Sequence, residues 1–206
     1  VVSMCFFMQI SKDATELKHR FNATFDGEAH FKPSIYSAFQ FPNTPIITAK
    51  EPSRIQMFQW GLIPPWAKND EIQKNTLNAR LETIHEKPSF KYVLQNRCLI
   101  PADAFFEWQW LDPKGKEKQK YRICLPDDSL FSFAGLYNQW VDPNSGEVKN
   151  TYTILTTEAN ELMSIIHNSK KRMPIILTPN DESNWLSGTL QNFKNIDLLA
   201  TPINKN

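Results

Sequence analysis

The pattern of apolar and polar residues along the chain predicts more strands than helices. In the first half, short apolar stretches rich in β-branched and aromatic residues predict strands over residues 35–41, 46–49 and 54–60. In the second half, strands are predicted over residues 97–100, 104–110, 121–125, 130–140, 151–157 and 175–177. Asp-Pro-Lys-Gly at 112–115 and Asp-Pro-Asn-Ser-Gly at 142–146 are turn sequences between such segments, so two hairpins are expected.

Apolar residues at helical spacing predict a few short helices around these strands. A helix over residues 11–21 has Ser11 as its expected cap, with Ala14, Leu17 and Phe21 on one face. A second short helix is expected over residues 88–95.

Two further helices are predicted in the last third of the chain. Thr157 is the expected cap of a helix over residues 158–167, with Leu162, Ile165 and Ile166 facing inward. Asn180 is the expected cap of a last helix that ends near Gly188.

These elements together predict an α+β fold. We expect a single domain over residues 1–206, built on a curved, mainly antiparallel sheet or open barrel with flanking helices. Residues 60–66, Trp-Gly-Leu-Ile-Pro-Pro-Trp, predict a turn that two prolines stiffen, followed by a polar loop over residues 67–78. Residues 190–206 are expected to be a C-terminal tail, and residues 1–3 a remnant that does not belong to the natural protein.

Composition narrows the class of protein. The 206 residues are 41% hydrophobic and 22% charged, as in an ordinary soluble domain, and no stretch approaches the roughly 18 apolar residues of a membrane span. The three cysteines, Cys5, Cys98 and Cys124, are too widely spaced for a zinc pattern, and an odd number does not form a disulfide framework. We therefore expect a cytoplasmic protein that needs no metal or organic cofactor and no membrane.

The formal net charge of +1 does not indicate a nucleic-acid-binding protein, but the basic residues are clustered. One cluster follows the first predicted hairpin turn, and the other lies between two predicted elements. Each run taken alone is more typical of a solvated surface than of a binding site. The runs are Lys114, Lys116, Lys118, Lys120 and Arg122, and then Lys170, Lys171 and Arg172.

Cys5 follows Met4, the first methionine of the chain. If Met4 is the initiator, its removal leaves Cys5 with a free α-amino group beside a thiol. The amine has an ordinary pKa of about 8 and the thiol one of about 8.5, so both are partly nucleophilic at cellular pH. Together they can trap an aldehyde as a five-membered thiazolidine, which an internal cysteine cannot do. The alternative interpretation is a small buried residue at the start of a strand.

Three further polar residues have both a chemical and a structural interpretation. Glu107 lies among aromatic residues, so it is either a desolvated general acid–base or a residue on the wet face of a strand. His167 is either a helix-terminal histidine or a proton shuttle. Asn78 either hydrogen-bonds a substrate or caps a surface helix. Arg80 either binds a phosphate or lies on the exposed side of that helix.

The order of the motifs is more specific than any one of them. Met-Cys, Trp-Gly-Leu-Ile-Pro-Pro-Trp, Asn-Ala-Arg-x-Glu-Thr, Phe-Phe-Glu-Trp, and His before Arg-Met-Pro follow one another from Met4 to about Leu177. This set resembles the SRAP family, the SOS-response-associated peptidase domain of abasic-site processing proteins. The resemblance implies a curved α+β fold and binding of single-stranded DNA that contains an abasic site.

The resemblance also implies roles for individual residues. Cys5 matches the family nucleophile, and Asn78 matches the asparagine that orients the cysteine and the sugar. Glu107 matches the acid–base glutamate, and His167 the histidine that assists Schiff-base formation. The expected DNA contacts are the aromatic residues Trp66, Phe90 and Trp108 and the arginines Arg80 and Arg172.

The leading hypothesis is therefore an abasic-site sensor of the DNA damage (SOS) response. It forms a covalent thiazolidine link to single-stranded DNA through Cys5 and has self-processing and lyase-like activity. We expect a monomer in the cytoplasm that associates with the nucleoid when bound to DNA. Two alternatives remain open: a cysteine peptidase acting on other proteins, with Cys5 as thiolate and His167 as base, and a non-catalytic binding module for single-stranded nucleic acid.

Overall fold

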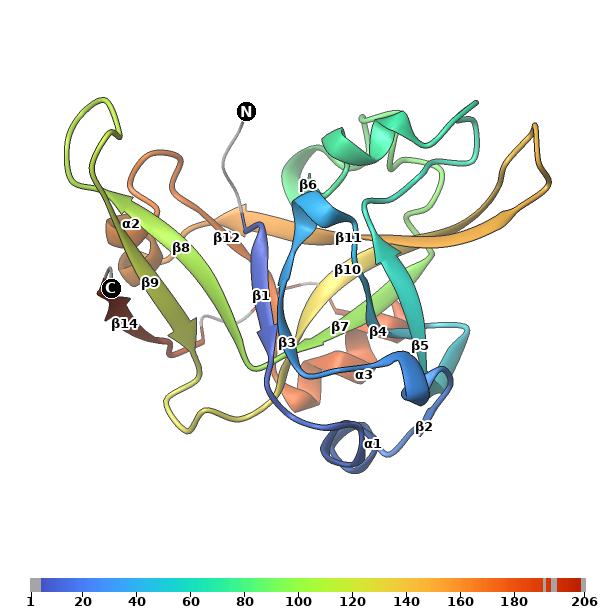
Figure 1. The fold of residues 1–206 in the computed structure, drawn as a ribbon, viewed down its shortest axis with the longest axis horizontal. Coiled ribbons are helices and arrows are strands. Elements are labelled where there is room, and N and C mark those ends of the chain that lie inside the picture. The colour runs from blue at the N-terminus through green and yellow to red at the C-terminus, as the bar shows by residue number, and fades with distance from the viewer. Residues whose placement is uncertain (1–4, 191, 194–195, 205–206) are drawn as a thin grey trace.

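A curved five-stranded sheet and a larger, barrel-like sheet enclose the core of the molecule (Figure 1). The computed structural model describes residues 5–190, 192–193 and 196–204. The expected initiator Met4 and the expected remnant over residues 1–3 lie outside the described residues.

The smaller sheet is antiparallel throughout. Its strands lie in the order β14-β9-β8-β1-β3. Their bounds are β1 Phe7–Ile10, β3 Ser34–Ser37, β8 Ala104–Trp110, β9 Lys118–Cys124 and β14 Leu199–Ile203.

The larger sheet runs in the order β12-β11-β10-β7-β4-β5-β2, with β13 paired to β10 and β6 paired to β11. A parallel pairing of β5 with β11 joins the two ends of the path from β11 to β5, so five strands close into a barrel. The bounds are β2 Thr24–Phe25, β4 Asn43–Thr48, β5 Glu51–Trp60, β6 Asn78–Arg80, β7 Arg97–Ala102, β10 Phe131–Val141, β11 Val148–Glu158, β12 Arg172–Pro174 and β13 Ile176–Leu177.

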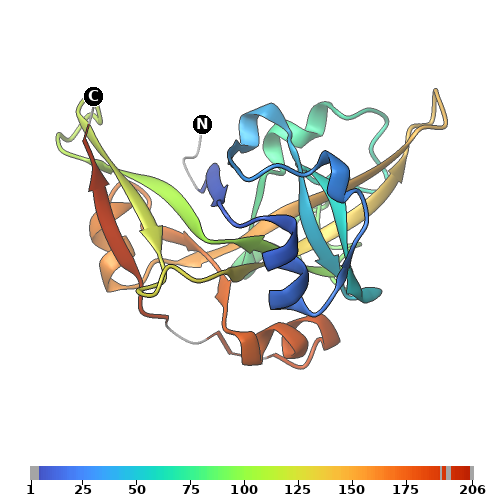
Figure 2. The ribbon, with the colours of Figure 1, turned by 60° about the horizontal axis from the view of Figure 1, so that its bottom comes forward.

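Short helices flank these sheets, as the sequence predicts. The α-helices are α1 Ala14–Phe21, α2 Glu161–Ile166 and α3 Pro179–Ser187, and the 3-10 turns are η1 Glu28–His30, η2 Ala38–Gln40, η3 Glu71–Asn75 and η4 Leu81–Thr83. Helix α3 packs against β7, β10 and β13 and lies along the bottom of Figure 2. The predicted α+β class with a curved, mainly antiparallel sheet is confirmed.

The predicted helix caps are wrong by two or three positions. Asp13, not Ser11, caps α1, because Asp13 and Glu16 form a reciprocal capping box. Asn160, not Thr157, caps α2, since Thr157 still belongs to β11. Thr178 takes the N-cap position of α3 in place of Asn180, whereas Gly188 ends that helix in the left-handed conformation, as expected.

Two other predictions about helices are also wrong. The segment 88–95 forms successive turns rather than a helix. In α2, Ile165 is 58% exposed, and Met163 is buried in its place beside Ile166. The physical reason is that α2 starts three residues later than predicted, which changes the residues on its inner face.

Both predicted hairpins are present, and the expected tail contains a strand. Figure 2 shows the β10–β11 hairpin extending to one end of the molecule, with β8, β9 and β14 at the other. Within the expected tail, β14 pairs with β9 from Leu199 to Ile203 and forms the edge of the smaller sheet. Pro202 is tolerated there because an edge strand does not need every N–H group.

Candidate functional site

Cys5 lies at the entrance to β1, and its backbone is held by Asn78. The side-chain Nδ2 of Asn78 donates a hydrogen bond to the backbone oxygen of Cys5 at 3.0 Å. Asn78 is the first residue of β6, which pairs with β11 of the larger sheet. The interpretation of Asn78 as a helix cap is therefore wrong, and its amide instead connects the N-terminal segment to the barrel.

Glu107 is buried on the inner face of β8, with only 2% of its surface exposed. Burial raises the pKa of Glu107 from 4.5 to about 8, and a backbone hydrogen bond from Trp108 opposes that rise. The carboxyl group therefore keeps its proton at neutral pH. The alternative of a residue on the wet face of a strand is excluded by this burial.

The thiol of Cys5 is buried close enough to Glu107 for their charges to interact. Burial, and then the charge of Glu107, raise the pKa of the Cys5 thiol well above its ordinary value, while a backbone hydrogen bond to Phe7 acts in the opposite direction. In this environment the thiol is protonated at neutral pH, unlike the thiolate of a typical cysteine peptidase.

His167 follows α2 as its C-terminal cap and is 1% exposed. Its Nδ1 lies 2.8 Å from the backbone oxygen of Arg172 and 3.3 Å from the backbone nitrogen of the same residue. The shorter contact is to an oxygen that can only accept, so we assign the proton to Nδ1. In a neutral ring with its proton on Nδ1, Nε2 carries the lone pair that a general base needs.

The last turn of α2 is fixed to the strand that carries Glu107. Gln109 Nε2 donates to the backbone oxygen of Ile165, and the side chain of Asn168 exchanges two hydrogen bonds with the backbone of Trp110. His167 is thereby held beside β8. The core cluster that contains Cys5 also includes Leu77, Phe105 and Ile166, from the segments that carry Asn78, Glu107 and His167.

Two buried polar atoms in this cluster lack a hydrogen bond within the described residues. They are Oδ1 of Asn78 and Oε1 of Glu107. Buried polar groups are almost always paired in native proteins, so such atoms mark a site where polar groups of a ligand can be bound. Both belong to residues that the sequence singles out.

Three of the predicted DNA contacts are accessible. Trp66 is 49% exposed, and its Nε1 donates to the backbone oxygen of Pro88, which fixes the ring. Arg80 ends β6 on the surface, and none of the ion pairs among the described residues involves it. Trp108 is partly exposed, with its ring 5.2 Å from that of Phe7.

The other two predicted DNA contacts, Phe90 and Arg172, are buried. Phe90 is 6% exposed and packs in the hydrophobic core, so its ring cannot stack on a base in this conformation. Arg172 is 8% exposed, and its guanidinium makes two hydrogen bonds to Glu82 and further bonds to Thr156. Burial acts to raise the pKa of Glu82, but the hydrogen bonds from Arg172 outweigh it and lower that pKa.

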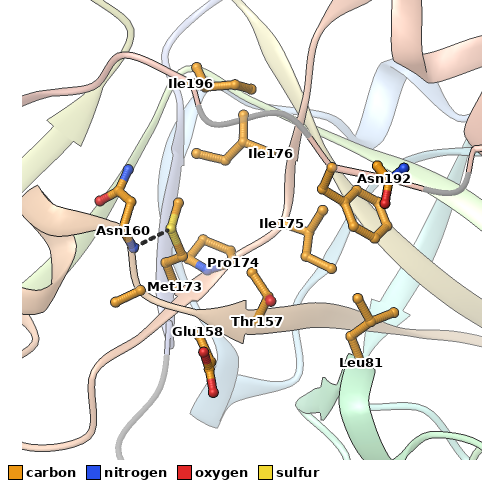
Figure 3. Close-up of a pocket in the computed structure, with 12 residues that line it drawn as sticks. Leu81, Thr157, Glu158, Asn160, Met173, Pro174, Ile175, Ile176, Asn192 and Ile196 are labelled. Atoms are coloured by element: carbon orange, nitrogen blue, oxygen red, sulfur yellow. Dashed lines mark hydrogen bonds between the residues drawn. The ribbon is translucent and has the colours of Figure 1, made fainter.

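A separate hollow of about 560 Å³ lies between β11, β12 and the segment after α3 (Figure 3). Its walls include Leu81, Met173 and Ile176, and the backbone nitrogen of Asn160 donates to the sulfur of Met173 inside it. Cys5, Asn78, Glu107 and His167 do not line this hollow. In the described part of the chain, no group of three or more acidic, histidine or cysteine side chains could hold a metal ion.

The comparisons with known proteins identify the family. The family model described as SOS response associated peptidase (SRAP) matches residues 4–206. This chain belongs to the SRAP family. Among relatives, the abasic site processing protein YoqW of Bacillus subtilis (strain 168) is 43% identical over 186 residues, which cover 89% of this chain and 80% of that protein.

Animal relatives match this chain over less than half of their own length. The abasic site processing protein HMCES of Gallus gallus is 37% identical over 152 residues, which cover 62% of this chain but 44% of HMCES. A solved protein from Bacteroides thetaiotaomicron has a TM-score of 0.88 at 37% identity and covers 97% of this chain and 92% of its own. One from Bordetella bronchiseptica has a TM-score of 0.80 at 26% identity, with coverage of 98% and 100%.

Two residues beside the predicted DNA contacts were not assigned by the sequence analysis. Glu82 is the partner of Arg172, although the two are 90 positions apart in the chain. Tyr92 is 65% exposed and lines a shallow groove together with Pro65, Trp66 and Pro88. The glutamate was visible within the Asn-Ala-Arg-x-Glu-Thr motif, but its role depended on a contact that only the fold creates.

No helix in the described residues is long and apolar enough to cross a membrane.

Proposed function

We propose that this SRAP protein processes abasic sites in single-stranded DNA by forming a thiazolidine between Cys5 and the sugar aldehyde. The observation that carries the proposal is the fixed position of Cys5. Its carbonyl is held by Asn78 at 3.0 Å, while its thiol lies within charge range of Glu107. The names of YoqW and HMCES as abasic site processing proteins support the same substrate.

The chemistry requires a free α-amino group on Cys5, and therefore the removal of Met4 and any residues before it. Glu107, which is protonated at neutral pH, donates to the ring oxygen of the closed sugar, and the C1 hydroxyl loses its proton to solvent as it becomes the aldehyde. The amine adds to the aldehyde carbon and water leaves to give an imine, with His167 taking the proton of the ammonium group. The thiol then adds to the imine carbon. One amine, one thiol and one aldehyde thus give one thiazolidine and one water.

The environment of the thiol favours this reaction over a thiolate peptidase. A peptidase nucleophile needs a lowered thiol pKa. Burial and Glu107 instead raise the pKa of Cys5. In the thiazolidine route the first attack is by nitrogen, and the neutral thiol acts second, so a raised thiol pKa is tolerated. We assign the peptidase activity in the family description to release of the residues that precede Cys5. We further propose that the protein is a monomer that binds DNA in the cytoplasm.

The test uses protein that begins at Cys5, confirmed by intact mass, and single-stranded DNA with one abasic site. We expect a covalent product on a denaturing gel whose mass is that of protein plus DNA minus one water. Cys5→Ala keeps the α-amine and can form only an imine, so its adduct needs borohydride to survive. Cys124→Ala removes a buried cysteine on β9 and should leave the adduct intact.

Two outcomes contradict the proposal. One is the absence of an adduct from protein whose Cys5 is shown to be unblocked. The other is an adduct whose mass shows that residues 1–4 are still attached, because that protein has no free amine on Cys5. Comparison of single-stranded with duplex DNA carrying the same lesion measures the proposed strand preference.

A further inference from the structure

Three side chains of the inner cluster, which is formed by Cys5, Asn78, Glu107 and His167, carry no charge at neutral pH. Burial raises the pKa of the Cys5 thiol well above its ordinary value and that of Glu107 to about 8, so both groups keep their protons. The amide of Asn78 does not titrate. These three groups offer hydrogen bonds and nucleophiles but no cation for a phosphate, so the aldehyde chemistry itself does not require the DNA backbone.

One buried atom of the inner cluster determines what a ligand must bring besides its aldehyde. Oδ1 of Asn78 has no hydrogen bond within the described residues, although Nδ2 of the same amide donates to the backbone oxygen of Cys5 at 3.0 Å. An amide oxygen can only accept, so Oδ1 requires an O–H or N–H group from the ligand. The ligand therefore needs a hydrogen-bond donor close to its reacting carbon.

A second buried atom fits the aldehyde group. Oε1 of Glu107 also lacks a hydrogen bond within the described residues, and Glu107 is 2% exposed. A protonated carboxyl group has an O–H that can donate to a carbonyl oxygen. Because the charge of Glu107 would act on the Cys5 thiol, this donor lies near the position of the reacting carbon.

An aldehyde with a hydroxyl group satisfies both atoms at once. Its carbonyl oxygen accepts from Glu107, and its hydroxyl donates to Oδ1 of Asn78. An apolar aldehyde of the same size leaves Oδ1 buried and unpaired, which is costly. Cys5 is only 1% exposed, so the aldehyde that reaches it without DNA must be short.

We propose that the inner cluster also reacts with free, short hydroxyaldehydes, and that the product caps Cys5 and blocks crosslinking to DNA. The inference rests on the proposed function, because it uses the same free α-amine and thiol. The nitrogen bonds to the aldehyde carbon, and the carbonyl oxygen leaves as water. The sulfur then adds to the imine carbon, and the thiol proton ends on the nitrogen. One aldehyde and one Cys5 give one thiazolidine and one water, with no oxidant or reductant.

The test compares glycolaldehyde with propanal, which has a methyl group in place of the hydroxyl. Protein that begins at Cys5 is mixed with each aldehyde, and intact mass follows the gain of one aldehyde minus one water. The peptide of residues 5–9 has the same amine and thiol but no folded site, so it corrects for the intrinsic reactivity of each aldehyde. We expect the ratio of rate constants, glycolaldehyde over propanal, to be about tenfold higher for the protein than for the peptide.

Two variants and one capped sample locate this selectivity. Asn78→Ala removes the acceptor and should lower the ratio to that of the peptide. The matched control, Asn180→Ala, removes the same amide from an exposed position in α3 and should leave the ratio unchanged. Wild-type protein capped with glycolaldehyde should crosslink abasic DNA at least about tenfold more slowly than uncapped protein, because both nucleophiles of Cys5 are in the ring.

The inference is overturned if wild-type protein and peptide show the same ratio, a comparison that does not depend on the folding of any variant. It is also overturned if Asn180→Ala lowers the ratio as much as Asn78→Ala, or if capped protein crosslinks at the uncapped rate. A raised ratio in protein that fails to crosslink abasic DNA would retain this inference and reject the proposed function. Crosslinking by protein that has the ratio of the peptide would do the reverse.

Discussion

Glu107 and Trp108 are neighbours in the chain, but they lie in two regions with opposite physical character. The inner cluster of Cys5, Asn78, Glu107 and His167 consists of polar groups buried at a cost in stability. The rim of Trp66, Arg80 and Trp108 consists of aromatic and basic groups in contact with solvent. Buried groups with shifted pKa values suit proton transfer, whereas accessible rings and cations suit reversible binding. The comparison predicts that variants of the two regions change different measurements.

The largest expected effect is that of Glu107→Gln on the rate of crosslinking. Glutamine keeps the shape and the burial but cannot donate the proton that opens the sugar ring. We expect the rate to fall by about 10²- to 10⁴-fold, with little change in reversible binding of undamaged DNA. Single-turnover gel assays and anisotropy on the same preparation measure the two quantities. A parallel loss of binding would show that the inner cluster and the rim are not separate.

The same substitution should alter the pH dependence of stability. Glu107 has a pKa of about 8 in the folded protein and 4.5 as its ordinary value, so folding takes up a proton between these pH values. The wild-type protein therefore loses stability as pH rises from about 4.5 to about 8, by about 1.4 kcal/mol per pH unit, and then levels off. Glu107→Gln lacks this pH-dependent contribution to the free energy of unfolding, because glutamine does not titrate.

Urea unfolding at a series of pH values between 5 and 8.5 measures the difference between the two proteins (roughly the range in which Glu107 titrates). The advantage of Glu107→Gln should grow toward pH 8. A difference that does not vary with pH would mean that Glu107 titrates normally, and it would remove the argument for an acid at neutral pH.

The sequence predicted the inner cluster better than the rim. Cys5, Asn78, Glu107 and His167 were found through short motifs whose residues converge once the sheets form. Phe90 and Arg172 were expected on the rim because one is aromatic and the other is basic. The type of a residue does not determine whether its side chain is exposed to solvent. An aromatic ring serves a core as well as a surface, and the burial of Arg172 depends on Glu82, a partner distant in the chain. The strand β14 was missed because its pairing partner β9 lies about 75 residues earlier.

The next effect separates two aromatic residues that the sequence treated alike. Phe90→Ala should lower the free energy of unfolding by about 3–5 kcal/mol, because it leaves a cavity in the core. Trp66→Ala should leave stability nearly unchanged but weaken reversible DNA binding by about 1–3 kcal/mol, since its ring is half exposed. Chemical denaturation and anisotropy measure both quantities for both variants. Equal losses of DNA binding in the two variants, each measured while folded, would place Phe90 on the rim after all.

The smallest expected effect distinguishes the two arginines. Arg172→Met breaks a bidentate pair and leaves Glu82 without its partner, but Glu82 is 42% exposed and can be hydrated. We therefore expect a loss of about 1–3 kcal/mol in stability, at the lower end of that range, and no change in the salt dependence of DNA binding. Arg80→Gln should leave stability within about 0.5 kcal/mol and reduce the salt slope by about 0.7, the value for one phosphate contact with a single strand. If Arg172→Met reduced the slope instead, Arg172 would have to leave Glu82 to reach DNA, and the boundary between core and rim would shift when DNA binds.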